Sequence, residues 1–179
     1  SFNNLGNSFN SKGEYDKAIE YHQKSLKIKL KIQGKKHPDV AAAFNNLGLS
    51  FNNKGEYDKA IDYHRRALEI RLNAFGENHP DVAMSFNNLG VSFNSKGDFD
   101  RAILYYQKAA QIWLNTYDEN YSSVAKSFNN LGVCFEGKGE YEKAIEYHQK
   151  ALKIRLNVFG ENHPEVAVSF INLGNIFSS

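Results

Sequence analysis

The stretch HPDVAAAFNNLGLSFNNKGEYDKAIDYHRRALEIRLNAFG, residues 37–76, decides the fold. Its first part places Val40, Phe44, Leu47 and Phe51 at intervals of four, three and four residues. This spacing puts the four apolar side chains on one face of an α-helix, because an α-helix turns once in about 3.6 residues. A half-buried β-strand would instead alternate apolar and polar residues. The stretch therefore begins with an amphipathic helix.

Two residues mark the limits of this helix, and a second helix follows it. Pro38 stands at the start, where the backbone N–H that proline lacks would have no partner. Gly55 is suited to the left-handed conformation that ends a helix. The second helix is predicted from about Glu56 to Phe75 and carries small and apolar residues on more than one side. A helix of that kind is buried between two neighbours.

The same pattern returns along the whole chain at a fixed interval. The segment FNNLG and its variant FINLG occur at Phe2–Gly6, Phe44–Gly48, Phe86–Gly90, Phe128–Gly132 and Phe170–Gly174, with 42 residues between successive glycines. A fixed period of about 20–50 residues is typical of solenoids and propellers, and the short alternating strands of a propeller blade are missing here. The sequence predicts an all-α solenoid of antiparallel helix pairs. The predicted single array has repeats at 1–36, 37–78, 79–120, 121–162 and 163–179, the first and last of them incomplete.

Three positions carry packing predictions. Gly48 lies inside a helix, where glycine costs about 1 kcal/mol relative to alanine. It is therefore expected to face Ala60 and to let the two helices approach closely. In the third repeat, Leu104 and Trp113 replace residues that are charged in the other repeats. They are predicted to form an apolar pair on an otherwise polar helix side, with the Trp113 side chain on the surface.

Composition limits the class of protein. Of the 179 residues, 41% are hydrophobic and 23% are charged, which is typical of a globular chain. The net charge of +2 favours neither nucleic acid nor a membrane surface. The single cysteine, Cys134, excludes an intramolecular disulfide and favours a cytoplasmic location. The chain starts at Ser1 inside a repeat, so we expect a fragment from which targeting segments are missing.

Several positions of each repeat form one shared pattern. It consists of a leucine-glycine pair and an aromatic residue, a glycine-tyrosine turn, and two alanines in the second helix. In the second repeat these are Leu47, Gly48, Phe51, Gly55, Tyr57, Ala60 and Ala67. The pattern resembles the tetratricopeptide repeat, whose usual length is about 34 residues. The longer form seen here, with G-x-x-H-P-x-V-A before NNL, is similar to the repeats of kinesin light chains. The usual proline after the second helix is absent.

The resemblance implies a right-handed superhelix in which the first helix of each pair lines a concave groove. On a helical wheel, the side of that helix opposite to Phe44, Leu47 and Gly48 carries amides and apolar residues and almost no charge. Such a surface is typical of a peptide-binding groove. The predicted binding residues are Asn4, Asn46, Asn88, Asn130, Asn172, Asn45, Asn87, Asn129, Leu49, Val91, Val133, Met84, Lys126 and Asn53.

Asparagine suits this purpose because its side chain both donates and accepts hydrogen bonds, so it pairs with the backbone of an extended peptide. The resemblance implies that the second asparagine of each pair contacts the ligand. The alternative is that the asparagines bond to one another or to the adjacent helix, and that the apolar residues touch the neighbouring repeat. Asn45, Asn87 and Asn129 lie nearer the helix flank and fit this alternative best.

The six histidines have two positions in the repeat. They are His22, His64 and His148, and then His37, His79 and His163. Equivalent residues of successive repeats lie about one helix pair apart, too far for one zinc ion with ligands at about 2 Å. Turn and packing roles are therefore predicted, without a metal or another cofactor. No nucleophile-base or paired-carboxylate arrangement stands out from the repeats, so the chain is not expected to be an enzyme.

The predicted function is a non-enzymatic protein–protein interaction scaffold that binds an extended peptide segment of a partner in the concave groove. The alternative is a self-associating solenoid, because the last helix leaves Phe170, Leu173 and Phe177 without a covering second helix. Copies would then join end to end or exchange helices. A third possibility is a regulatory module of a larger enzyme or sensor. The expected partners are proteins or peptides and, in the alternative, further copies of the chain, but neither nucleic acid nor membrane.

Overall fold

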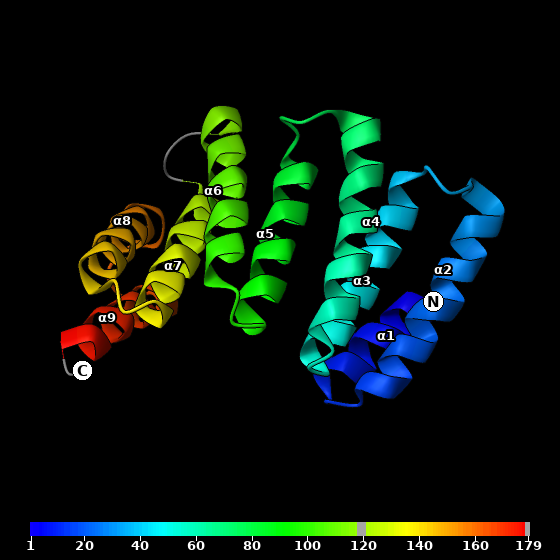
Figure 1. The fold of residues 1–179 in the computed structure, drawn as a ribbon, viewed down its shortest axis with the longest axis horizontal. Coiled ribbons are helices and arrows are strands. Elements are labelled where there is room, and N and C mark those ends of the chain that lie inside the picture. The colour runs from blue at the N-terminus through cyan, green and yellow to red at the C-terminus, as the bar shows by residue number, and fades with distance from the viewer. Residues whose placement is uncertain (118–120, 178–179) are drawn as a thin grey trace.

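The computed structural model describes residues 1–117 and 121–177, and all regular secondary structure in these ranges is helical. The helices are α1 (Phe2–Ser11), α2 (Tyr15–Gln33), α3 (Pro38–Asn53), α4 (Tyr57–Phe75), α5 (Pro80–Ser95), α6 (Phe99–Thr116), α7 (Ser122–Gly137), α8 (Tyr141–Phe159) and α9 (Pro164–Phe177). Each helix packs against the next one along the chain (Figure 1). The predicted all-α solenoid of helix pairs is confirmed. In the described ranges, no helix combines the length and the apolar character that a membrane span requires.

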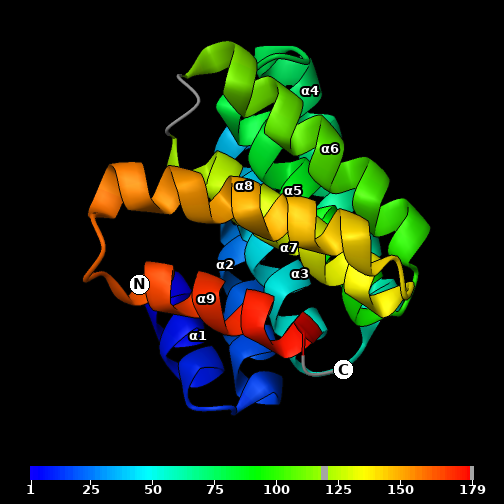
Figure 2. The same ribbon diagram turned by 90° about the vertical axis from the view of Figure 1, so that its left-hand side faces the viewer.

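The helix pairs stack with a curvature. We call the odd-numbered helices first helices and the even-numbered ones second helices. Successive first helices contact each other directly: α1 contacts α3, α3 contacts α5, and α5 contacts α7. Within the described residues, successive second helices make fewer contacts with each other than these first helices do. The first helices are therefore closer together and form the inner side of the array. Figure 2, viewed along the array from the α9 end, shows that successive pairs are rotated relative to one another.

The ends of the helices follow from local chemistry. Helix α3 begins at Pro38, as predicted. The preceding His37 caps it, since its Nδ1 accepts a hydrogen bond from the backbone N–H of Asp39 at 3.2 Å. Beyond the other end, Gly55 has a φ of +85°, the left-handed conformation expected there. The second helix of this pair begins one residue later than predicted.

The glycine of the FNNLG segment faces an aromatic ring. A Cβ atom added to Gly48 would lie 2.5 Å from Cε1 of His64, whose side chain is buried. The three nearest atoms all belong to this imidazole, so His64, which the prediction did not name, lies closest to Gly48. The equivalent pairs are Gly6 with His22, Gly90 with Tyr106, and Gly132 with His148. Glycine is required because a buried ring occupies the space that a side chain would take.

The buried histidines are held in the neutral state. Loss of hydration lowers the pKa of His64 to about 4, and the nearby charge of Arg71 acts in the same direction. Burial also lowers the pKa of His22 and His148. The Nδ1 atoms of all three have no hydrogen-bond partner among the described residues. These imidazoles therefore act as apolar packing groups at neutral pH.

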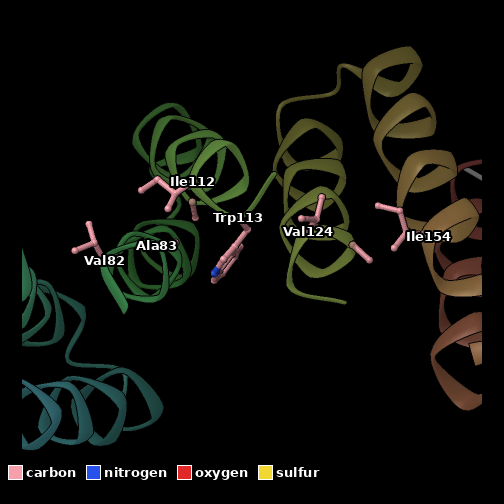
Figure 3. Close-up of a cluster of buried hydrophobic side chains, with 8 residues drawn as sticks. Val82, Ala83, Ile112, Trp113, Val124 and Ile154 are labelled. Atoms are coloured by element: carbon pink, nitrogen blue, oxygen red, sulfur yellow. The ribbon is translucent and has the colours of Figure 1, made fainter. Parts of the chain in front are cut away.

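The third repeat places a tryptophan inside the array. Trp113 is only 5% exposed, so the prediction that its side chain lies on the surface is wrong. It belongs to a buried cluster with Val82, Ala83, Val124 and Ile154, contributed by four different helices (Figure 3). By contrast, Leu104 is exposed, as predicted, and the two residues do not form a surface pair.

Two charged counterparts of Trp113, Arg71 and Arg155, are buried as well. Arg71 is buried, and its Nη1 donates to Oγ of Ser85 at 2.8 Å and to the backbone oxygen of Asp81 at 3.1 Å. Trp113 does not make the equivalent bond, since the hydroxyl oxygen of Ser127, the counterpart of Ser85, is buried without a hydrogen-bond partner among the described residues. The repeat position of Arg71 and Trp113 thus joins each second helix to the following first helix. A charged residue at this position is therefore no sign that the side chain lies on the protein surface.

Candidate functional site

The predicted binding residues lie on the first helices, at the inner side of the array. The second-position asparagines Asn46, Asn88, Asn130 and Asn172 are half-buried, and Asn4 is exposed. Among the apolar members, Leu49, Val91 and Val133 are half-buried and Met84 is 45% exposed. Lys126 is exposed and is the only charged member of the set. The surface therefore combines amides with partly accessible apolar groups, as expected.

Hydrogen bonds between asparagines join successive first helices, and we call each of these bonds a rung. The Nδ2 of Asn46 donates to Oδ1 of Asn3 at 2.6 Å. In the next repeat, Asn88 donates to Oδ1 of Asn45. At the other end, Asn172 donates to Oδ1 of Asn129 at 2.8 Å. The asparagines thus bridge repeats, which was one of the two roles considered for them.

One rung is open. The equivalent bond between α5 and α7 would join Asn130 to Asn87, but Asn130 makes no side-chain hydrogen bond within the described residues. Asn87 is 6% exposed, and its Oδ1 has no hydrogen-bond partner there. A buried acceptor without a donor costs about 1–3 kcal/mol. In the middle of the inner surface, the Oδ1 of Asn87 therefore lacks a hydrogen-bond donor, and the side-chain amide of Asn130 makes no hydrogen bond to a described residue.

The rungs involve residues that the sequence prediction left out. Asn3 accepts the first rung, and Asn10 accepts a bond of 3.3 Å from Asn53. In all these bonds the donor follows the acceptor by 43 residues, one more than the repeat period. A search for polar pairs at the period plus or minus one residue would have identified them.

The histidines occupy the turn and packing positions that were expected. His79 and His163 cap α5 and α9 through Nδ1, as His37 caps α3, while the other three pack against glycines. No three metal-binding side chains converge anywhere in residues 1–117 and 121–177. Cys134 is buried, and burial raises the pKa of its thiol to about 12. It is a packing residue without thiolate character.

Comparison with known proteins places the chain in a family. The sequence profile of the tetratricopeptide repeat matches residues 1–72, 39–115, 81–157 and 123–179. The chain belongs to the tetratricopeptide repeat family. The tetratricopeptide repeat fold is a protein–protein interaction scaffold, and repeats of this family generally mediate binding between proteins. Relatives of this class are typically non-enzymatic.

Solved structures of several other proteins share the fold. BtubC (BKLC) from P. vanneervenii is 29% identical over 97% of this chain and 69% of its own, with a TM-score of 0.84. A putative kinesin light chain from Podospora anserina with nearly identical repeats is 18% identical over 99% of this chain and 84% of its own, with a TM-score of 0.84. The apo form of RapI is 17% identical over 99% of this chain and 47% of its own, with a TM-score of 0.79. No curated protein sequence matches. The kinesin-light-chain-like class of repeat is confirmed.

Proposed function

We propose that this scaffold binds an extended peptide segment of a partner protein along the inner surface formed by its first helices. We also propose that the whole chain acts as one array with the repeat boundaries predicted from the sequence. Each closed rung uses one N–H of the second-position asparagine. The carbonyl oxygen and the other N–H of that side chain remain for a ligand. Half-buried Leu49, Val91 and Val133 supply apolar contacts beside these amides.

The open rung carries the proposal. The Oδ1 of Asn87 lacks a donor but is buried, so the half-buried amide of Asn130 is the part of this rung that the backbone of an extended peptide can reach. Asn130 stands on the opposite side of the same rung, on α7, with its full amide available to the peptide. A strand of ligand backbone lying along α7 would both donate to and accept from this amide. This rung therefore supports an anchor point for a peptide whatever its side chains are.

Replacing Asn130 with alanine tests this anchor point. Because Asn130 makes no side-chain hydrogen bond in the described structure, Asn130→Ala should change the free energy of unfolding by less than about 0.5 kcal/mol. Peptides selected from a display library on the wild-type chain should bind the variant about tenfold more weakly, a loss of about 1.4 kcal/mol. Titration calorimetry measures the affinity, and urea denaturation measures the stability.

Asn88→Ala is the matched control, because it removes a closed rung and leaves the buried Oδ1 of Asn45 without its donor. We expect it to lower the free energy of unfolding by about 1–2 kcal/mol. If every selected peptide binds Asn130→Ala as tightly as wild type, the open rung has no role in binding.

Self-association is the second candidate function, favoured by apolar side chains exposed at both ends of the array. On α9, Phe170 is 56% and Ile171 is 59% exposed. At the other end, Phe2, Leu5 and Ile28 line a hollow of about 430 Å³. Contacts between such unlike surfaces would propagate from copy to copy.

Static light scattering over a concentration series tests the second candidate. The mean mass should rise with concentration, and Ile171→Lys should suppress the rise because it places a charge in the exposed α9 surface. A constant monomer mass at the highest concentration would exclude self-association of this chain.

A further inference from the structure

Two equivalent pockets lie between successive second helices, on the outer side of the array. The pocket between α2 and α4 has a volume of about 480 Å³ and a floor formed by Leu30, Phe44 and Ile70. The pocket between α4 and α6 has a volume of about 540 Å³, and its floor contains the equivalent residues Leu72, Phe86 and Ile112. Both volumes fall within the range of about 300–1,000 Å³ that ligand pockets occupy. Equivalent residues of successive repeats thus form the same apolar floor in both pockets.

The rims of the two pockets differ in charge. The α2–α4 pocket carries three cationic side chains, Lys35, Lys36 and Arg66, and one carboxylate, Glu69. The equivalent residues of the α4–α6 pocket are Glu77, Asn78, Lys108 and Gln111. One cation and one carboxylate remain there. The α2–α4 pocket therefore attracts anions, and the α4–α6 pocket has no such preference.

The rim of the α2–α4 pocket keeps a net positive charge, with three cations against the single carboxylate of Glu69. Lys35 and Lys36 are exposed, and no described residue forms an ion pair with either of them. Arg66 lies over the ring of Phe44, with its guanidinium carbon 5.9 Å from the ring centre, so its charge borders the apolar floor directly. An apolar group bound on this floor would bring its flanking residues next to all three cations.

We infer that the α2–α4 pocket is a docking site for an acidic peptide segment that inserts an apolar side chain against Leu30, Phe44 and Ile70. Carboxylates on either side of the inserted residue pair with Lys35 and Lys36. This site is separate from the inner surface, so one chain can hold two segments of its partners. The α4–α6 pocket has an equivalent floor but fewer cations on its rim, so comparing the two pockets isolates the effect of the rim charges.

The experiment exchanges the rim charges between the two pockets. The probe is a fluorescein-labelled heptapeptide of sequence EELFLEE, measured by fluorescence polarisation and by titration calorimetry. Wild type should bind one equivalent of the peptide in the α2–α4 pocket. Lys35→Glu combined with Lys36→Asn should weaken binding at least tenfold, and Glu77→Lys combined with Asn78→Lys should create a second equivalent. All four side chains are exposed, so both variants should retain the fold, which circular dichroism checks.

Four further measurements complete the test. QQLFLQQ should bind at least tenfold more weakly than EELFLEE, and higher salt should weaken the binding of EELFLEE, since the contacts lie at an exposed rim. Asn130→Ala should leave the affinity for EELFLEE unchanged. Equal binding by wild type and by the Lys35, Lys36 double variant would overturn the inference, as would competition by single-stranded DNA at lower concentration than EELFLEE. Neither result bears on the inner surface, whose test uses different residues.

Discussion

Alanine at Gly48 is expected to lower the free energy of unfolding by about 2 kcal/mol. The new Cβ would lie 2.5–2.7 Å from three atoms of the His64 ring, which is buried and has little room to move. Overpacking of this kind costs about 1–3 kcal/mol, and a strained helix contact is at the upper end of that range. The gain of about 1 kcal/mol from replacing a helical glycine offsets only part of the cost. Urea denaturation followed by circular dichroism measures the change.

The chain offers a matched control for this variant. Gly174 occupies the same position of the repeat, but a Cβ added there would meet no atom within 4 Å. Gly174→Ala should therefore leave stability unchanged or raise it by up to about 1 kcal/mol. In a background carrying His64→Ala, Gly48→Ala should likewise become neutral or stabilising. Equal effects of the two alanine variants in the wild-type background would show that the His64 ring does not explain the glycine.

Replacing His64 with tyrosine should make the array more resistant to acid. In the folded chain the pKa of His64 is about 4, whereas the unfolded chain has the ordinary value near 6.5. The unfolded state therefore takes up a proton first as pH falls, so the stabilisation is complete above about pH 6.5 and is lost progressively toward pH 4. The 2.5-unit difference corresponds to a loss of about 3 kcal/mol at pH 4. Tyrosine does not take up a proton in this range.

The third repeat shows that tyrosine fits at this position, because Tyr106 packs against Gly90 as His64 packs against Gly48. Between pH 7 and pH 4, His64→Tyr should lose about 3 kcal/mol less stability than wild type. Tyr106→His is the reciprocal control and should add to the acid sensitivity. Denaturant midpoints at a series of pH values give the comparison. Parallel pH profiles for wild type and His64→Tyr would mean that His64 is not held neutral.

Much of the fold could be predicted from the sequence because it depends on local chemistry. Pro38 and Gly55 mark helix ends through backbone properties of single residues, and both predictions are confirmed. The 42-residue period then extends one helix pair to the whole array. The class of repeat follows from the same positions. These features need no knowledge of how one repeat is placed against the next.

The predictions that failed needed that knowledge. Trp113 was expected on the surface because its counterparts are charged, yet this position faces the following first helix, where Arg71 also is buried. For Gly48 the prediction named Ala60 and omitted His64, whose ring, four residues further along the second helix, makes the closest contact. Bonds between asparagines were considered, but the pairing in each rung was not identified, because the rungs join residues 43 apart and comparing equivalent positions reveals only separations of 42.

The rungs lie on one side of the array, and this determines how it deforms. Asparagine bonds join the first helices at three of the four junctions of the inner edge, whereas the second helices α2, α4 and α6 are separated by the two outer pockets. When the array bends, the spacing of the first helices at the inner edge therefore changes little, and the spacing of the second helices at the outer edge changes more. Flattening the array narrows the gap between second helices, and tightening its curl widens that gap. The distance between Lys36 and Arg66, on the rim of the α2–α4 pocket, thus depends on the curvature of the array.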